Sequence, residues 1–233
     1  MIAVTFKNRA VMRLLPIVFP VFALSHFAHA ATKADAGTDA FDRAFALKGK
    51  PASVHYTAEY LGNGTIHHVA AWRDGDRRVM RRTDDRLEIY GEHDARGPDF
   101  TLTVVDLKRN IRSTVDRAHL AQIGHFMDWN DLAYALRRPV AGYRVAALAG
   151  KPALPEGVSA AGPCRWFELT DQSRHWRICW SASAALPFLI LDDEAHVQWR
   201  ITSVEKGPIA ASRFEAPTAG LVLNDVSADI SGD

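Results

Sequence analysis

Hydrophobic and polar residues alternate through much of the segment 53–107, a pattern typical of half-buried β-strands. The clearest case is a predicted hairpin around Asn63-Gly64, the dipeptide best suited to a type I′ turn. One face of this hairpin carries Val54, Tyr56, Ala58, Tyr60, Val69 and Ala71, and the other carries His55, Glu59, His68 and Trp72. Further strands over Arg77–Thr83, Arg86–Tyr90 and Phe100–Leu107 complete a predicted antiparallel meander.

Helical patterns interrupt the strands in two places. Thr38 is the predicted cap of a helix that runs to about Lys48, with Phe41, Ala44, Phe45 and Leu47 near one face. The segment Arg117–Pro139 fits one or two short helices, the second capped by Asp128 and presenting Trp129, Leu132, Ala133 and Leu136. Strands are predicted again over Tyr143–Leu148, Phe188–Leu191 and His196–Val204. The order predicts an α+β fold in which a few short helices cover an antiparallel sheet.

The first thirty residues have the pattern of a secretory signal peptide. Lys7, Arg9 and Arg13 precede the apolar stretch Leu14–Leu24, and Ala28-His29-Ala30 is a small-x-small cleavage site. The apolar stretch is well short of the roughly 20 residues that span a bilayer. We therefore predict a signal peptide over 1–30, cleaved after Ala30, and a single exported periplasmic domain over 31–233. An uncleaved anchor is the alternative.

Cleavage changes the charge of the protein. Residues 1–30 hold three of the 28 basic residues and none of the 27 acidic ones, so the mature chain carries a formal charge of about −2. This balance provides no basic surface for nucleic acid, and we expect no nucleic-acid partner.

The two cysteines, Cys164 and Cys179, face each other in a predicted hairpin whose turn is centred between Asp171 and Gln172. The same register opposes Trp166 to Arg177, Phe167 to Trp176 and Glu168 to His175. Directly opposed strand residues are close enough for a disulfide bond. Neither the C-x₂₋₄-C spacing of zinc sites nor a C-x-x-C redox motif is present. We predict a disulfide, which requires an oxidising compartment. Two free buried thiols are the alternative.

No catalytic or nucleotide-binding motif is present, neither G-x-S-x-G nor H-E-x-x-H, P-loop or dinucleotide fingerprint. His67 and His68 point to opposite faces of one strand, and His93 lies in a polar segment where a solvated cluster is the simpler interpretation. The acid pairs Asp84-Asp85 and Asp192-Asp193 fall where turns are expected. We expect no metal, no cofactor and no catalytic residue.

A basic stripe crosses neighbouring predicted strands and consists of Arg73, Arg77, Arg78, Arg81 and Arg82. The simpler interpretation is a solvated face of the sheet. The alternative is a docking surface for an acidic partner or for phospholipid head groups.

The aromatic and aliphatic residues of the strands either fill a core or line a pocket. When a strongly curved sheet is closed by a few short helices, the space between them can remain an apolar pocket. The residues that we expect to line such a pocket are Tyr56, Tyr60, Leu102, Val104, Trp129, Leu132, Ile190 and Ile201.

The C-terminal stretch Leu186–Pro217 reads "LPFLILDDEAHVQWRITSVEKGPIAASRFEAP". It opens a strand with Leu-Pro and leads from a W-R-I-T strand to an F-x-x-P ending. Together with the N-terminal helix, the long meander and the helices inserted midway, it resembles the LolA/LolB-type periplasmic lipoprotein carriers and the related RseB N-terminal domain. The resemblance implies a LolA-like incomplete β-barrel closed by helices, whose hydrophobic interior holds acyl chains without a cofactor.

The function that we expect is therefore binding. We predict a soluble, monomeric periplasmic protein that binds an acyl chain, a lipoprotein or another apolar ligand without catalysis. The alternative is an envelope protein-interaction or regulatory module with a filled core, as the RseB resemblance implies. A third hypothesis is an envelope enzyme with an active site that matches none of the known motifs. Co-purified lipid would favour the first hypothesis, capture of a partner without lipid the second, and catalytic turnover the third.

Overall fold

The computed structural model describes residues 34–45, 53–93, 99–116, 129–140, 142–171 and 174–225. By its internal contacts the chain divides into two units, Met1–Ala31 and Thr32–Asp233, and the description below concerns the second. The predicted signal peptide and its cleavage site lie outside the described residues, as does the first part of the helical segment predicted from Arg117. Within the described ranges, no helix has the length and hydropathy that crossing a membrane requires.

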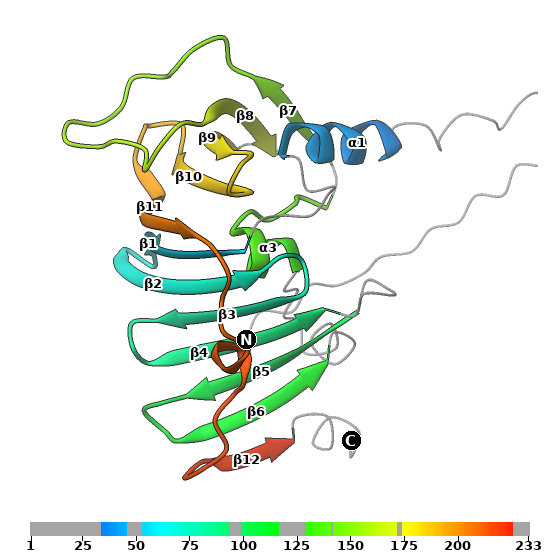
Figure 1. The fold of residues 1–233 in the computed structure, drawn as a ribbon. Helices are drawn as coiled ribbons and strands as arrows, with labels where there is room; N and C mark the ends of the chain where they lie inside the picture. Colours follow the sequence, from blue (N-terminus) through cyan, green and yellow to red (C-terminus); the bar gives the residue numbers. More distant parts are fainter. Residues whose placement is uncertain are drawn as a thin grey trace, which may run out of the picture. The chain divides into compact units, whose positions relative to one another are not determined.

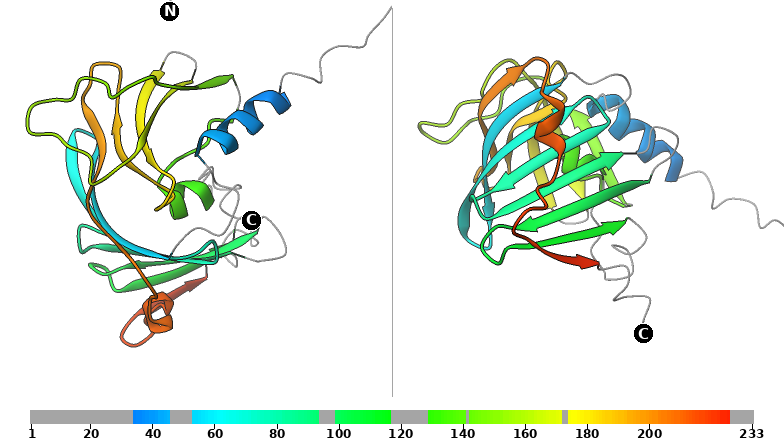
Figure 2. Two further views of the ribbon diagram at one scale, coloured as in Figure 1. Left: turned by 45° about the horizontal axis from the view of Figure 1, so that its top comes forward. Right: turned by 60° about the horizontal axis from the view of Figure 1, so that its bottom comes forward.

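The described strands form a single 12-stranded sheet in the order β12-β6-β5-β4-β3-β2-β1-β11-β10-β9-β8-β7. Neighbours pair antiparallel, except that β12 pairs parallel with β6. The sheet curves strongly and stays open between its edge strands β7 and β12 (Figures 1 and 2). Its strands are β1 Val54–Gly62, β2 Thr65–Asp74, β3 Arg78–Thr83, β4 Leu87–His93, β5 Phe100–Asp106, β6 Ile111–Asp116, β7 Tyr143–Ala147, β8 Arg165–Asp171, β9 Arg174–Ser181, β10 Leu186–Leu191, β11 Val197–Lys206 and β12 Val222–Asp225.

Two short α-helices, α1 (Ala34–Phe45) and α3 (Trp129–Tyr134), lie on the concave side of this sheet (Figure 2, left). A 3₁₀ turn, η1 (Ala211–Phe214), lies in the segment that crosses the convex side on its way from β11 to β12 (Figure 2). The open, curved sheet with a few short helices agrees with the predicted fold class.

Helix α1 begins four residues earlier than predicted, so Thr38 lies inside the helix and does not cap it. Ala34 and Ala36 explain the earlier start, because alanine has the highest intrinsic helix propensity. The apolar face is as predicted for Phe41 and Phe45, which are both fully buried. The ring of Phe45 makes edge contacts at 5.3 Å with Phe167 of β8, and so attaches the helix to the sheet.

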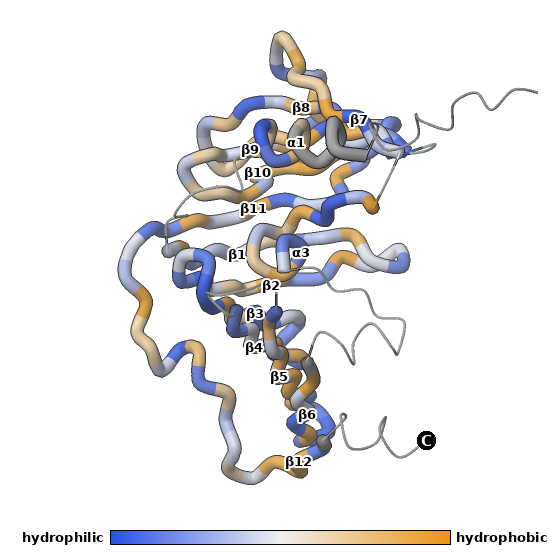
Figure 3. Tube along the Cα trace, turned by 90° about the vertical axis from the view of Figure 1, so that its right-hand side faces the viewer, coloured by the Kyte–Doolittle hydropathy of each residue, from blue (hydrophilic) through white to orange (hydrophobic). Residues whose placement is uncertain are grey.

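The β1–β2 hairpin confirms the predicted turn and register. Asn63 and Gly64 have φ values of 49° and 75°, the left-handed values that a type I′ turn requires at both central positions. Tyr56 pairs with Ala71, and Ala58 with Val69, so that the predicted apolar residues share one face. That face is the concave one, because its residues are buried, apart from the half-buried Tyr60, while the opposite face is half-buried or exposed. Figure 3 shows how hydrophobic and hydrophilic residues follow one another along the chain.

The disulfide bond between Cys164 and Cys179 is present, with the Cα atoms 5.3 Å apart. The register predicted around it is wrong, because Trp166 and not Cys164 lies opposite Cys179, and the turn falls one residue further along. Cys164 precedes β8 and reaches Cys179 diagonally. The observed register creates two opposed apolar pairs, Phe167 with Ile178 and Leu169 with Trp176. Cross-strand packing of these pairs outweighs direct opposition of the cysteines.

Two strands, β6 and β12, were not predicted. β12 has four residues and pairs only with β6, after a connection that crosses the convex side. Such a strand forms because a distant partner is in place, and local periodicity therefore does not reveal it.

Candidate functional site

On the concave face a row of paired, mostly apolar side chains crosses β9, β10, β11, β1 and β2. Directly paired residues of antiparallel strands share a face. The register pairs Ile178 with Ile190, Ile190 with Trp199, Trp199 with Tyr60, and Tyr60 with His67. In this row, which runs from β9 to β2, Ile190, Tyr60 and His67 are half-buried, whereas Ile178 and Trp199 are buried.

A cavity of about 490 Å³ opens on this face. Its floor is Leu169, Trp176, Ile178 and Ile190, from strands β8, β9 and β10. The connection 135–140, between α3 and β7, supplies the facing wall. Ala135 starts this wall with φ of 51°, a left-handed conformation that ends α3 five residues before the predicted stop at Pro139. The cavity therefore lies between apolar strand residues and the loop 135–140. The path of this loop follows from the left-handed conformation of Ala135.

Three arginines border the cavity. Arg138 forms an ion pair with Asp42 of α1 and lies over the ring of Phe41. Arg174 bonds to Asp171 at 3.0 Å and lies 4.8 Å from the centre of the Trp176 ring. Arg137 is exposed, and no partner among the described residues is recorded for it. Asp42 and Asp171 pair with two of the three arginines, so the cavity combines an apolar floor with a polar border on which Arg137 is exposed.

The eight residues predicted to line a pocket all lie on the concave face or on α3, but they do not share one site. Ile190 lines the cavity. Leu102, Trp129 and Leu132 belong to a buried cluster under α3, against which Val104 packs. Tyr56 and Ile201 belong to a second buried cluster, against which Tyr60 packs. Their role as ligand contacts remains a prediction.

Helix α3 is held tightly over its part of the sheet. Gly91 of β4 lies directly beneath it, where a Cβ atom would come within 2.8 Å of Leu132 Cδ2 and 3.1 Å of Trp129 Cζ3. Asp76 Oδ1 accepts hydrogen bonds from Trp129 Nε1 at 2.8 Å and from the Tyr134 hydroxyl at 2.6 Å. Burial and this carboxylate raise the pKa of Tyr134, so that the phenol stays protonated.

The basic stripe is not a single surface, because successive strand residues face opposite sides. Arg73 is fully buried on the concave side and donates to the carbonyl oxygens of Ala133, Ala184 and Ala185, at 2.6–3.0 Å. The other face carries ion pairs that join Arg77 and Arg78 to Asp74, and Arg82 to Glu88. The interpretation as a solvated face is therefore wrong for Arg73, which fastens α3 and the β9–β10 turn to the sheet.

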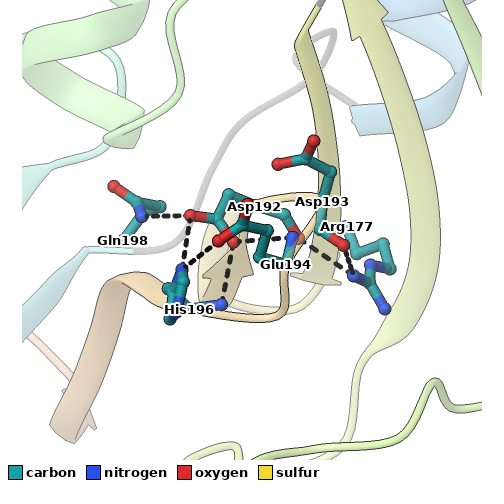
Figure 4. Close-up of polar contacts among 6 residues, drawn as sticks. All are labelled: Arg177, Asp192, Asp193, Glu194, His196 and Gln198. Carbon is teal, nitrogen blue, oxygen red and sulfur yellow. Dashed lines mark hydrogen bonds and ion pairs between the residues drawn. The ribbon is translucent and has the colours of Figure 1, made fainter.

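The acid pairs are turn residues, as predicted. Asp84 and Asp85 both have left-handed φ values, and Asp84 accepts from His67 Nδ1 and from the His68 amide. Asp192 organises the β10–β11 loop by accepting from two backbone amides of the loop and from Gln198 Nε2 (Figure 4). Arg177 of β9 closes the loop by donating to the carbonyl oxygens of Asp192 and Asp193 (Figure 4). Among the described residues, no group of His, Cys, Asp and Glu is arranged to hold a metal ion.

The sequence reasoning missed most of the cavity residues. Trp176 and Ile178 stand in an alternating strand pattern, which could have identified them had the β8–β9 register been correct. The wall 135–140 carried no such signal, because its position depends on how α3 docks on Gly91.

No protein-family model matches this chain, and no curated protein matches its sequence. Among solved structures it is similar to MucB, with a TM-score of 0.41 and 14% identity, over 81% of this chain and 66% of the matched chain. It is also similar to MucB in complex with MucA(peri), with a TM-score of 0.41 and 15% identity, over 82% of this chain and 62% of the matched chain. The chain thus spans less than two thirds of the length of the matched chains. These values describe a distant likeness and do not assign the chain to a family.

Proposed function

We propose that this protein is an exported binding protein of the periplasm, which takes an apolar ligand such as a lipid or lipoprotein acyl chain on its concave face, without catalysis. The predicted signal peptide and the disulfide bond support export to an oxidising compartment. The proposal concerns binding alone and assigns no catalytic residue.

The cavity beside β8, β9 and β10 is the observation that carries this proposal. Its volume of about 490 Å³ lies within the range of small-molecule sites, roughly 300–1,000 Å³. The apolar floor supplies affinity through burial of ligand surface, about 25 cal/mol per Å² before the costs of association. The row of paired residues leads from Ile190 through Trp199, which is 6% exposed, to the half-buried Tyr60, and this direction favours an extended chain over a compact ligand.

Filling the cavity tests the proposal. Ile190 is half-buried at the cavity floor, so Ile190→Trp directs the larger ring into open space. We expect saturable binding of a fluorescent fatty acid by the wild type and at least tenfold weaker binding by this variant, with a nearly unchanged melting temperature. Leu132→Trp is the matched control, because Leu132 is 2% exposed in a filled cluster and has no space for a ring.

Mass spectrometry of organic extracts from protein purified out of the periplasm identifies the natural ligand. Absence both of extracted lipid and of saturable fatty-acid binding by the wild type would contradict the proposal.

The second candidate is an envelope protein-interaction module. The observation that favours it is the tight packing of five predicted lining residues, none more than 6% exposed: Tyr56, Leu102, Trp129, Leu132 and Ile201. Capture of a defined envelope protein by lipid-free material, unaffected by Ile190→Trp, would select this candidate over ligand binding.

A further inference from the structure

Arg81 differs from the other four arginines of the stripe in its contacts. Arg73 bonds to three carbonyl oxygens, and the convex-side arginines form ion pairs with Asp74 or Glu88. Arg81 forms no hydrogen bond or ion pair with any described residue, and its Nε, like that of Arg78, is buried without a hydrogen bond. The buried Nε has lost water without a hydrogen bond in exchange, whereas the guanidinium as a whole is half-buried and contacts the ring of Tyr60.

Arg81 lies on the concave face. In the register it pairs with Ala71, which pairs in turn with Tyr56. Its Cζ lies over the ring of Tyr60, 5.6 Å from the ring centre. Burial raises the pKa of Tyr56, and the positive charge of Arg81 opposes that rise, which agrees with a short separation between the two side chains. The guanidinium therefore faces the inside of the half-barrel among tyrosines.

A continuous path of contacts joins Arg81 to the cavity. Ile190 at the cavity floor pairs with Trp199, and Trp199 stacks against Tyr60 with ring centres 6.5 Å apart. Arg81 lies on the far side of this path, over Tyr60. β10 and β3 are four strand spacings apart in the sheet, about 19 Å along its surface. One end of the path is thus an apolar cavity, and the other is an arginine that forms no ion pair with a described residue.

We propose that Arg81 binds the anionic end of the ligand, and that the ligand is a long-chain amphiphile whose head group is a carboxylate or a similar oxyanion. This inference rests on the proposed function and deepens it, since it assigns a charge to one end of the ligand. A guanidinium presents forked donors that match a carboxylate, and the bond strengthens where water is scarce. Arg81 is a binding residue, and the apolar row orients the chain toward it.

The binding test uses a matched pair of probes, dansyl-labelled undecanoic acid and its methyl ester, which differ in charge. We expect Arg81→Met to weaken binding of the acid about tenfold or more and to leave binding of the ester unchanged. Arg86→Met is the matched control, because Arg86 is exposed on the turn between β3 and β4 and should change neither affinity. An equal effect of Arg81→Met on both probes, or an effect on neither, would overturn the inference while the proposed function stands.

The second readout needs no ligand. If the charge of Arg81 serves binding and not folding, Arg81→Met should raise the melting temperature of the ligand-free protein, because an apolar chain replaces a half-buried guanidinium that has no ion pair with a described residue. A lower melting temperature would show a structural role and overturn the inference. Stabilisation of the wild type by inorganic phosphate alone, with no preference for the acid over the ester, would do the same. Failure of the wild type to bind either probe would overturn the proposed function together with the inference.

Discussion

The concave face contains two regions that differ in what covers them. Under α3, the strand residues Val79, Ile89 and Leu102 are buried in a filled cluster. Beside β8, β9 and β10, Leu169 and Ile178 belong to the same cluster as Phe45 of α1. The half-buried Trp176 and Ile190, however, border a cavity whose facing wall is the loop 135–140. Both regions carry apolar side chains on one face of one sheet. The comparison shows that an apolar strand face becomes core or binding surface according to how closely its cover approaches.

The largest expected difference between the two regions concerns loss of side-chain volume. Leu102→Ala should lower the free energy of unfolding by about 2–5 kcal/mol, because Leu102 is 1% exposed and its neighbours cannot fill the space. Ile190→Ala should cost clearly less, since Ile190 already borders open space. Urea denaturation of the two variants measures both values. Equal losses would show that the cavity region is packed as tightly as the region under α3.

The disulfide bond joins the residue before β8 to β9, and both strands contribute to the cavity floor. Replacing Cys164 and Cys179 together by Ser should cost about 3 kcal/mol, the value expected for opening a loop of this length. Hydrogen exchange should increase most in β8 and β9, which the bond joins, and least in β3 and β4. Free-thiol titration of native wild-type protein provides the control. Two reactive thiols would contradict the presence of the disulfide bond in the native protein.

Gly91 tests how closely α3 approaches the sheet. Gly91→Ala should lower the free energy of unfolding by about 1–3 kcal/mol, because the new Cβ would lie 2.8 Å from Leu132 Cδ2 and 2.9 Å from Val79 Cγ1. A thermal melt or urea titration measures this effect. Gly162→Ala is the control, since its Cβ would meet only the edge of the Phe188 ring, at 3.2 Å. A neutral Gly91→Ala would mean that α3 moves away easily and that the filled region can open.

The smallest expected effect lies on the convex face, outside both regions. Hydrogen bonds from Arg77 and Arg78 lower the pKa of Asp74 to about 2, below its ordinary 3.8. Because the folded-state pKa is the lower one, this carboxylate contributes its stability above about pH 4 and loses it as the pH falls toward 2. Allowing for solvent screening, we expect a contribution of about 1–2 kcal/mol.

Asp74→Asn should remove that contribution at pH 7 and narrow the stability difference between variant and wild type near pH 2. Urea denaturation at the two pH values measures it. Ligand binding on the concave face should leave the effect unchanged.

Local turn chemistry explains which parts of the fold could be predicted. Asn63-Gly64 adopts a type I′ turn for reasons contained in two residues, and the β1–β2 register follows from that turn. The region around Cys164 and Cys179 lacks such a turn signal, and there the register follows from packing of Phe167 against Ile178. The disulfide bond could be predicted because two cysteines can also bond when they lie diagonally across a strand pair. The pairing register of β8 and β9 around the bond could not be predicted.

The arginine stripe shows the same limit at the level of the site. Strand periodicity places Arg73 and Arg81 on one face and Arg78 and Arg82 on the other. It does not reveal that Arg73 meets three backbone carbonyls from α3 and the β9–β10 turn, whereas Arg81 meets a tyrosine ring. These partners come from segments more than fifty residues away from Arg73, and no local pattern contains them.

The sequence alone determined that this chain alternates into antiparallel strands, that Phe41 and Phe45 face inward, and that its two cysteines can form a bond. These features depend on side-chain periodicity and on turns, which are properties of neighbouring residues. The tertiary structure alone decided that the cavity lies at Trp176 and Ile190, and that Arg81 contacts the Tyr60 ring but forms no ion pair with a described residue. The physical reason is that a pocket is the space left between segments distant in sequence, and its size depends on where each segment stops.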